Sequence, residues 1–109
     1  MAFDEALAQR VREALAEELD VSEQDMSGGR AFLVRGNMAC GVVGEGLMVR
    51  VGADRYEEAL RQPHARETSL GGRTLVGFVS VEAAGFESEA DLRGWVMRGT
   101  RHARSLRRK

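Results

Sequence analysis

Short apolar stretches separated by glycines, between Met26 and Gly52, constrain the fold of this chain more than any other feature. The segments follow one another as Ala31–Val34, Arg35-Gly36-Asn37, Met38–Val43, Gly44-Glu45-Gly46 and Leu47–Val51. Runs of this length can form strands, and Gly and Asn between them are typical of tight hairpin turns. The pattern therefore predicts a three-stranded antiparallel meander.

A second hairpin is expected further along the chain. Glu67–Leu70 and Arg73–Val81 flank Gly71-Gly72, and a Gly-Gly pair supplies the positive φ angles that a two-residue turn demands. The arm from Leu75 to Val81 is apolar at most positions, which predicts a central strand covered on both faces.

Helical periodicity surrounds these hairpins. Apolar residues four positions apart predict a helix from Phe3 to about Leu19, and a short helix is expected from Arg55 to Arg61. Ser88 is a plausible N-cap for a last helix that carries Leu92 and Trp95 on its apolar side. The order predicts an α+β fold, α-β(3)-α-β(2)-α, with a mainly antiparallel five-stranded sheet and helices packed on it.

Length and composition favour one domain over residues 1–109, with 98–109 as the basic end of the last helix. Hydrophobic residues make up 43% and charged residues 30% of the chain, as in soluble globular proteins. No apolar run approaches the ~18 residues of a membrane span, and the acidic N-terminus does not resemble a secretory signal. One cysteine makes no internal disulfide, so a cytoplasmic location without membrane contact is expected.

The residues that usually carry catalysis do not form a constellation. Cys40 lies in mid-strand, where a thiol usually packs, while His64 falls in a loop and His102 in the last helix. That spacing offers no usable metal-ligand pair, and no glycine motif stands between a strand and a helix to hold a phosphate. We therefore expect no catalytic residue, no cofactor and no metal.

The candidate interaction residues fall into two sets. The first set, in the strand region, contains Met26, Gly28, Gly29, Met38 and Arg50. Methionines can line a partner groove, and paired glycines suggest a bulge or a closely approaching backbone. The second set lies close to one side of the last helix, where it would contact phosphates, and contains Arg98, Arg101 and Arg104.

The apolar content of the strands suggests an interaction surface. The predicted strands carry more apolar residues than three small helices can cover. These residues are Phe32, Val34, Met38, Cys40, Val42 and Phe78. A large uncovered apolar area tends to mark an interface. We expect a non-enzymatic regulatory or protein-interaction module that binds another protein and forms a homodimer.

Two alternatives stay open. An arginine-rich last helix would suit an accessory protein that binds nucleic acid, although a pI near 6.1 and few aromatic residues argue against a dedicated module. A pocket between sheet and helices would suit a small molecule, although few titratable groups converge.

Several short motifs, taken in order, resemble the N-terminal domain of the bacterial TfoX/Sxy family of competence regulators in its stand-alone form. They are Met26-Ser27-Gly28-Gly29, Gly36-Asn37-Met38-Ala39, Leu47–Gly52, Tyr56, Ala59-Leu60, Pro63, Arg66, Gly72-Arg73, Gly77-Phe78-Val79, Leu92 and Trp95-Val96. Ser27 stands where the family pattern has an aromatic residue. The resemblance covers most of residues 23–109 and implies a fold similar to the secretion-chaperone-like folds. It also implies no enzymatic activity and no established cofactor, while competence control in full-length relatives involves a second, C-terminal domain.

Overall fold

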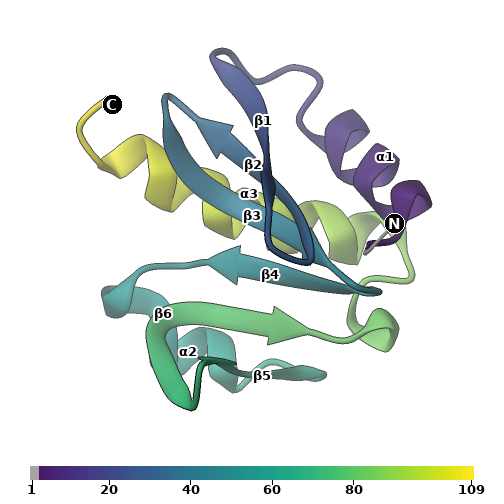
Figure 1. The fold of residues 1–109 in the computed structure, drawn as a ribbon, viewed down its shortest axis with the longest axis vertical. Coiled ribbons are helices and arrows are strands. Elements are labelled where there is room, and N and C mark those ends of the chain that lie inside the picture. Colours follow the sequence, from purple (N-terminus) through teal and green to yellow (C-terminus); the bar gives the residue numbers. More distant parts are fainter. Residues whose placement is uncertain (1–2) are drawn as a thin grey trace.

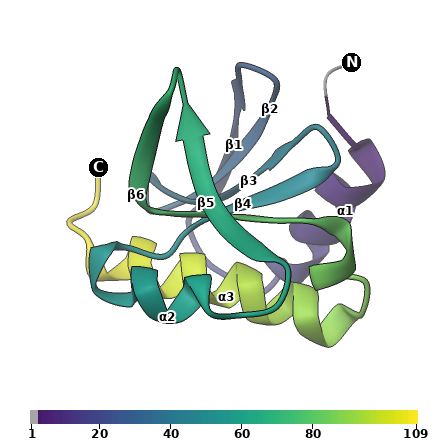
Figure 2. The same ribbon diagram turned by 90° about the horizontal axis from the view of Figure 1, so that it is seen from below.

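Within residues 3–109, three α-helices pack on one face of a six-stranded antiparallel sheet (Figures 1 and 2). The computed structural model describes residues 3–109, so Met1 and Ala2 of the expected domain lie outside the described residues. The helices are α1 (Glu5–Ala14), α2 (Tyr56–Leu60) and α3 (Glu89–Ser105), with short 3-10 turns η1 (Ala53–Arg55) and η2 (Ala83–Gly85). The strands are β1 (Val21–Met26), β2 (Gly29–Val34), β3 (Asn37–Val43), β4 (Gly46–Arg50), β5 (Ala65–Leu70) and β6 (Arg73–Val81).

The expected α+β class is confirmed, but the strand count of five is wrong. The sheet runs in the order β1-β2-β3-β4-β6-β5, and β1 is the additional strand. Its six residues pair along their whole length with β2, from Val21 opposite Val34 to Met26 opposite Gly29. The element order is therefore α-β(4)-α-β(2)-α, in which both predicted hairpin systems are present.

The first helix is shorter than its apolar spacing predicts. Helix α1 ends at Ala14, and Leu19, expected on its apolar face, is 74% exposed. Asp20 has a φ of 62°, a left-handed conformation with which the chain turns into β1. Strand β1 thus begins at Val21, directly after the point near Leu19 to which the first helix was predicted to extend.

Strand β6 is covered on one face only, so the expectation of burial on both faces is wrong. Gly77, Val79 and Val81 are buried beneath the helices, whereas Phe78 and Ser80 remain partly exposed on the opposite face. The strand lies between β4 and β5, next to the edge of the sheet. Its apolar residues therefore lie on two faces of the sheet, the buried face that packs against the core and the opposite face that is partly exposed.

The core lies between the sheet and the helices, and a β-bulge shapes its centre. Phe32 pairs with Cys40 while Leu33 pairs with Met38, so Ala39 is the extra residue of β3. Ala39 and Cys40 are both fully buried, and Ala39 packs with Ala103 of α3. Phe32, Val34, Cys40 and Val42 are likewise fully buried, so the expectation that the helices leave these four uncovered is wrong.

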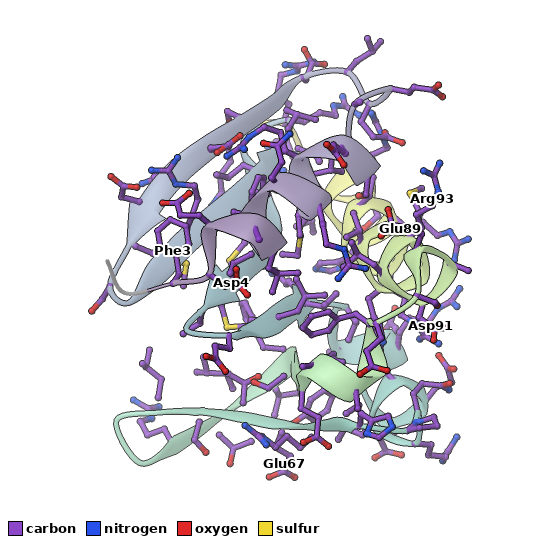
Figure 3. All side chains as sticks on the ribbon, turned by 90° about the vertical axis from the view of Figure 1, so that its right-hand side faces the viewer. Phe3, Asp4, Glu67, Glu89, Asp91 and Arg93 are labelled. Atoms are coloured by element: carbon purple, nitrogen blue, oxygen red, sulfur yellow. The ribbon has the colours of Figure 1, made fainter. Side chains whose placement is uncertain are left out.

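The two ends of the chain and its first and last helices are tied down by specific bonds. The Asp4 carboxylate caps α1 (Figure 3), and the Asp4 amide donates to the Gly44 carbonyl oxygen at 2.8 Å. The Arg10 guanidinium joins α1 to the start of α3 by donating to Glu89 at 2.8 Å and to the Phe86 carbonyl at 2.9 Å. At the other end, the Lys109 amide donates to the Arg35 carbonyl in the β2–β3 turn at 3.1 Å.

Candidate functional site

The face of the sheet without helices holds a trough of about 570 Å³. Figure 2 shows the β1–β2 and β5–β6 hairpins bending away from the helices on either side of β3 and β4. The apolar side chains that line the trough are Met26, Val43, Met48, Leu70 and Leu75. The sheet therefore offers a concave, largely apolar surface to the outside.

Three methionines gather on this face around Gly41. A Cβ atom at Gly41 would lie 3.0 Å from Met38 Cε and 3.4 Å from Met26 Sδ, so the missing side chain leaves room for both. Met48 is directly opposite Gly41 across the β3–β4 pair. The structure thus brings together Met26 and Met38, two of the sequence-derived candidates, and adds Met48. Methionines adapt their shape easily, which suits a surface that has to fit another one.

Arg50 belongs to the same face of the sheet. Arg50 is directly opposite Phe78 in the β4–β6 pair, and its guanidinium lies 5.7 Å from the centre of the Phe78 ring. This cation–π contact covers part of an aromatic ring that no helix protects.

Gly28 and Gly29 have structural roles at the β1–β2 turn. Gly28 has a φ of 77°, a conformation that favours glycine. A side chain on Gly29 would overlap the carbonyl oxygen of Val42, so the expected close approach of another backbone is confirmed there. These two glycines thus shape the β1–β2 turn beside Met26, which lines the trough.

The β5–β6 hairpin forms a projecting rim with exposed apolar residues. Leu70 is 69% and Val76 is 63% exposed near the Gly71-Gly72 turn, whose two residues have positive φ angles as expected. Arg66 of β5 and Glu45 of the β3–β4 turn both line the trough and make no ion pair within residues 3–109. The trough and its rim thus carry both apolar groups and unpaired charges of opposite sign.

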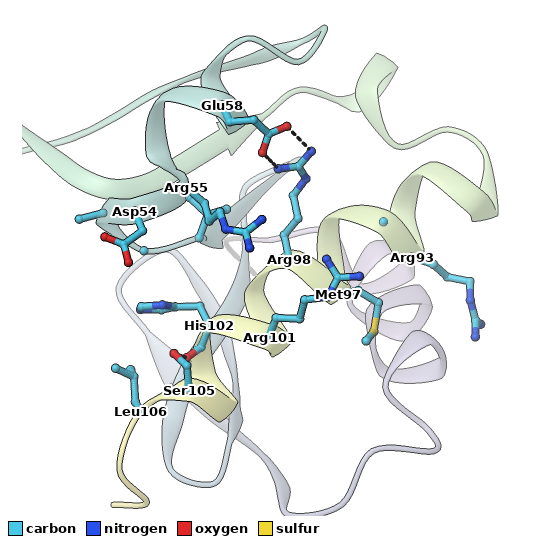
Figure 4. Close-up of a pocket in the computed structure, with 14 residues that line it drawn as sticks. Asp54, Arg55, Glu58, Arg93, Met97, Arg98, Arg101, His102, Ser105 and Leu106 are labelled. Carbon is cyan, nitrogen blue, oxygen red and sulfur yellow. Dashed lines mark hydrogen bonds and ion pairs between the residues drawn. The ribbon is translucent and has the colours of Figure 1, made fainter.

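A second concave site lies on the helix side of the molecule, between α2 and α3 (Figure 4). This α2–α3 groove has a volume of about 1060 Å³. Its charged lining consists of four arginines and two acids, namely Arg55, Arg93, Arg98, Arg101, Asp54 and Glu58. Its apolar lining includes Val51, Ala53, Met97 and Leu106.

Among the residues that the structure describes, one of the four groove arginines has a carboxylate partner. Arg98 donates to both carboxylate oxygens of Glu58, at 2.7 and 3.1 Å, and lies 5.1 Å from the centre of the Trp95 ring. Hydrogen bonds from Arg98 hold the pKa of the Glu58 carboxyl below its usual range. Arg55, Arg93 and Arg101 make no ion pair within residues 3–109, so the groove carries an uncompensated positive charge.

The structure separates Arg104 from the other two arginines of the sequence-derived helix set. Arg104 donates to Glu18 at 2.7 Å, beyond the α2–α3 groove, and Arg108 pairs with Asp20 at 2.7 Å. Arg98 and Arg101 share the groove with Arg55, which sequence reasoning missed. Arg55 is far from them in the sequence, and only the packing of η1 and α2 beside α3 reveals it.

His102 also lines the α2–α3 groove. A side chain on Gly52, whose φ is 87°, would overlap the His102 ring, so the turn after β4 packs directly on the imidazole. Burial lowers the pKa of His102, the Arg50 charge lowers it further, and Asp54 opposes both effects. The ring is therefore biased toward its neutral form.

Cys40 is placed where it cannot act as an exposed nucleophile. Its side chain is fully buried in the core, and burial raises the pKa of its thiol to about 12. Among residues 3–109 no three histidine, cysteine or acidic side chains gather as a metal site would require. Within the same residues, no helix is both long enough and apolar enough to pass through a membrane.

Comparison with known proteins confirms the family that the motifs resemble. The TfoX N-terminal domain family matches residues 5–103, nearly the whole chain. No curated protein and no solved structure matches the chain significantly. Because the family match extends over nearly all of its residues, the chain belongs to the TfoX N-terminal domain family.

Proposed function

We propose that this chain is a protein-interaction module without turnover chemistry, and that it self-associates through the helix-free face of its sheet. The observation that carries the proposal is the methionine-lined trough with its exposed apolar rim. Apolar area of this kind gains free energy when it leaves water. A regulatory role would act through such binding.

A second copy of the chain is the occupant that fits this surface. In a two-fold dimer the same patch meets itself, so the rim of one protomer must fit the trough of the other. Leu70 and Val76 project from the rim and are large enough to enter an apolar trough. Arg66 and Glu45 have opposite charges on the same surface, so a two-fold axis that passes between them would place each residue opposite the other one in the second copy.

Light scattering coupled to size-exclusion chromatography tests the proposal over a wide concentration range. The unmodified protein is expected to show a concentration-dependent mass approaching that of two chains. The double variant Leu70→Lys/Val76→Lys places charge on the rim and is expected to weaken association at least about tenfold, since burying one such side chain is worth about 1.5–3 kcal/mol.

Leu19→Lys is the control, because Leu19 is at least as exposed as Leu70 and Val76 but lies outside the β5–β6 hairpin. It is expected to leave the dimerisation constant unchanged. A protein that stays monomeric at high concentration would refute self-association. Equal weakening by the control would show that the sheet face is not the interface.

A further inference from the structure

We propose that the α2–α3 groove binds an acidic segment of a partner protein, one that also carries apolar side chains. The groove lies on the helix side of the molecule, whereas the proposed self-association face lies on the other side of the sheet (Figure 2). It is therefore a second surface, and each proposal can fail without the other.

The charge of the groove identifies the sign of the ligand. Figure 4 shows Arg55 of η1 and Arg101 of α3 on either side of the Arg98 side chain. Bringing guanidinium groups together costs electrostatic free energy, which an anionic ligand relieves. Elsewhere on α1 and α3 the chain neutralises its arginines, as the pairs of Arg10 with Glu89 and of Arg104 with Glu18 show.

One arginine of the groove is held ready for binding. Arg98 is fixed from two sides, by both oxygens of Glu58 and by the Trp95 ring. A side chain that is already ordered loses little conformational entropy on binding. Arg55 and Arg101, which have no such partner, supply the free donors for carboxylates.

The length and floor of the groove favour a peptide over a small anion. Its lining follows α3 from Arg93 to Leu106, roughly 20 Å at the rise of an α-helix. Met97 and Leu106 provide apolar contacts between and beyond the arginines. A single phosphate or carboxylate would engage one end only, whereas an acidic amphipathic segment would use charges and apolar floor together.

The same lining disfavours nucleic acid. Asp54 and Glu58 would face its phosphates, and no Phe, Tyr or Trp side chain lines the groove to stack on a base. A protein segment can place its acidic residues beside the arginines and leave the two carboxylates uncontacted.

A displayed library of random twelve-residue peptides, selected on the full chain, tests the inference. The selected peptides are expected to be rich in Asp and Glu and to contain Leu, Ile or Met. Fluorescence anisotropy with the best peptide is expected to show at least tenfold weaker binding to Arg55→Glu/Arg101→Glu and weaker binding as salt rises. Both arginines lack ion pairs within residues 3–109, so thermal unfolding should be little changed.

Arg73→Glu/Arg107→Glu is the matched control, because it makes the same charge change on exposed arginines outside the groove. It is expected to bind the peptide within about twofold of the unmodified chain, given the screening of distant charges. Selected peptides without acidic bias, or equal binding by the groove variant, would overturn the inference. Groove-dependent binding of a single-stranded 20-nucleotide DNA, with no groove-dependent peptide, would overturn it in favour of nucleic acid.

The rim variant Leu70→Lys/Val76→Lys separates this inference from self-association. It is expected to bind the acidic peptide as the unmodified chain does. Loss of peptide binding in that variant, with its fold intact, would place the peptide on the sheet face and refute the groove.

Discussion

Gly99 sets the distance between α3 and the centre of the sheet. A methyl group at this position would overlap the carbonyl oxygen of Ala39, the extra residue of the β3 bulge. Gly99→Ala is therefore expected to push the helix outward and to lower the free energy of unfolding by about 1–3 kcal/mol. Urea denaturation, with its linear extrapolation, measures the change.

Gly94 provides the control on the same helix. Its Cβ position is open, with no atom within 4 Å. Gly94→Ala is expected to raise the free energy of unfolding by about 0.5–1 kcal/mol through helix propensity alone. Equal effects of the two substitutions would contradict the proposed contact between Gly99 and Ala39.

His102 should give the fold a pH dependence at mildly acidic pH. Burial lowers the pKa of the folded imidazole below the value of about 6.5 expected in the unfolded chain. Between these two pKa values the unfolded state binds more protons, so the contribution is complete above about pH 6.5 and is lost as pH falls through the folded pKa.

His102→Gln is expected to flatten the curve of unfolding free energy against pH in this window. Urea titrations at successive pH values measure the slope. The loss of stability at lower pH should remain, because Arg12 and Arg98 lower the carboxyl pKa values of Glu23 and Glu58. An unchanged slope near pH 6 would show that the ring is not desolvated.

At the scale of elements, β1 shows why one strand escaped sequence reasoning. Its residues are mostly polar. On the side of the strand that faces the helices, Glu23 forms ion pairs in place of apolar contacts. Arg12 of α1 donates to Glu23 at 2.8 Å, and Arg30 of β2 donates to it at 3.3 Å. Alternation of apolar residues identifies strands that pack on a core, so a strand held by arginines gives no such signal.

Part of the two candidate sites, the trough and the α2–α3 groove, could be predicted from the sequence. Met26 and Met38 were candidate interaction residues, and both lie on the helix-free face. The β-bulge at Ala39 puts Met38 on the face of Gly41, whereas strict alternation would have put it on the buried face of Cys40. Arg55 lies in the same groove as Arg98 and Arg101 because α2 packs beside α3, and no local sequence pattern encodes that packing. The burial of Phe32 and Cys40 similarly depends on three helices sharing one face of the sheet.

The end of α3 is attached to the sheet by one buried amide. The Asn37 side chain is 2% exposed, and its Nδ2 donates to the Arg107 carbonyl oxygen at 2.9 Å. Asn37→Ala is expected to lower the free energy of unfolding by about 1–2 kcal/mol, because a buried hydrogen bond is lost. Chemical denaturation checks it.

Arg108→Ala is the comparison for Asn37→Ala. It removes only the half-exposed pair with Asp20 and is expected to cost less than about 1 kcal/mol. If the two substitutions cost the same, the attachment is carried by the surface pair and not by the buried amide.

For the whole molecule, the one-sided arrangement makes Cys40 a reporter of unfolding. The thiol is buried in β3, a central strand, between the sheet and the helices. A reagent such as 5,5′-dithiobis(2-nitrobenzoate) therefore reaches it only when the structure opens. Its reaction is expected to be at least about a thousandfold slower in native buffer than in denaturant, given a stability of about 5 kcal/mol or more.

Leu19→Cys adds an exposed thiol as an internal control. Its new thiol is expected to react at once, while Cys40 in the same molecule reacts slowly. Two fast phases in native buffer would show that the sheet opens on its helix side without global unfolding.

The attachment of both chain ends also has a mechanical consequence. Asp4 bonds to the turn that follows β3, and Lys109 bonds to the turn that precedes it, so the ends are fastened at opposite tips of one central strand. Stretching the molecule from its ends would load these two fastenings before any strand could slide. Resistance to such tension would then depend on a few terminal hydrogen bonds, and only afterwards on the sheet itself.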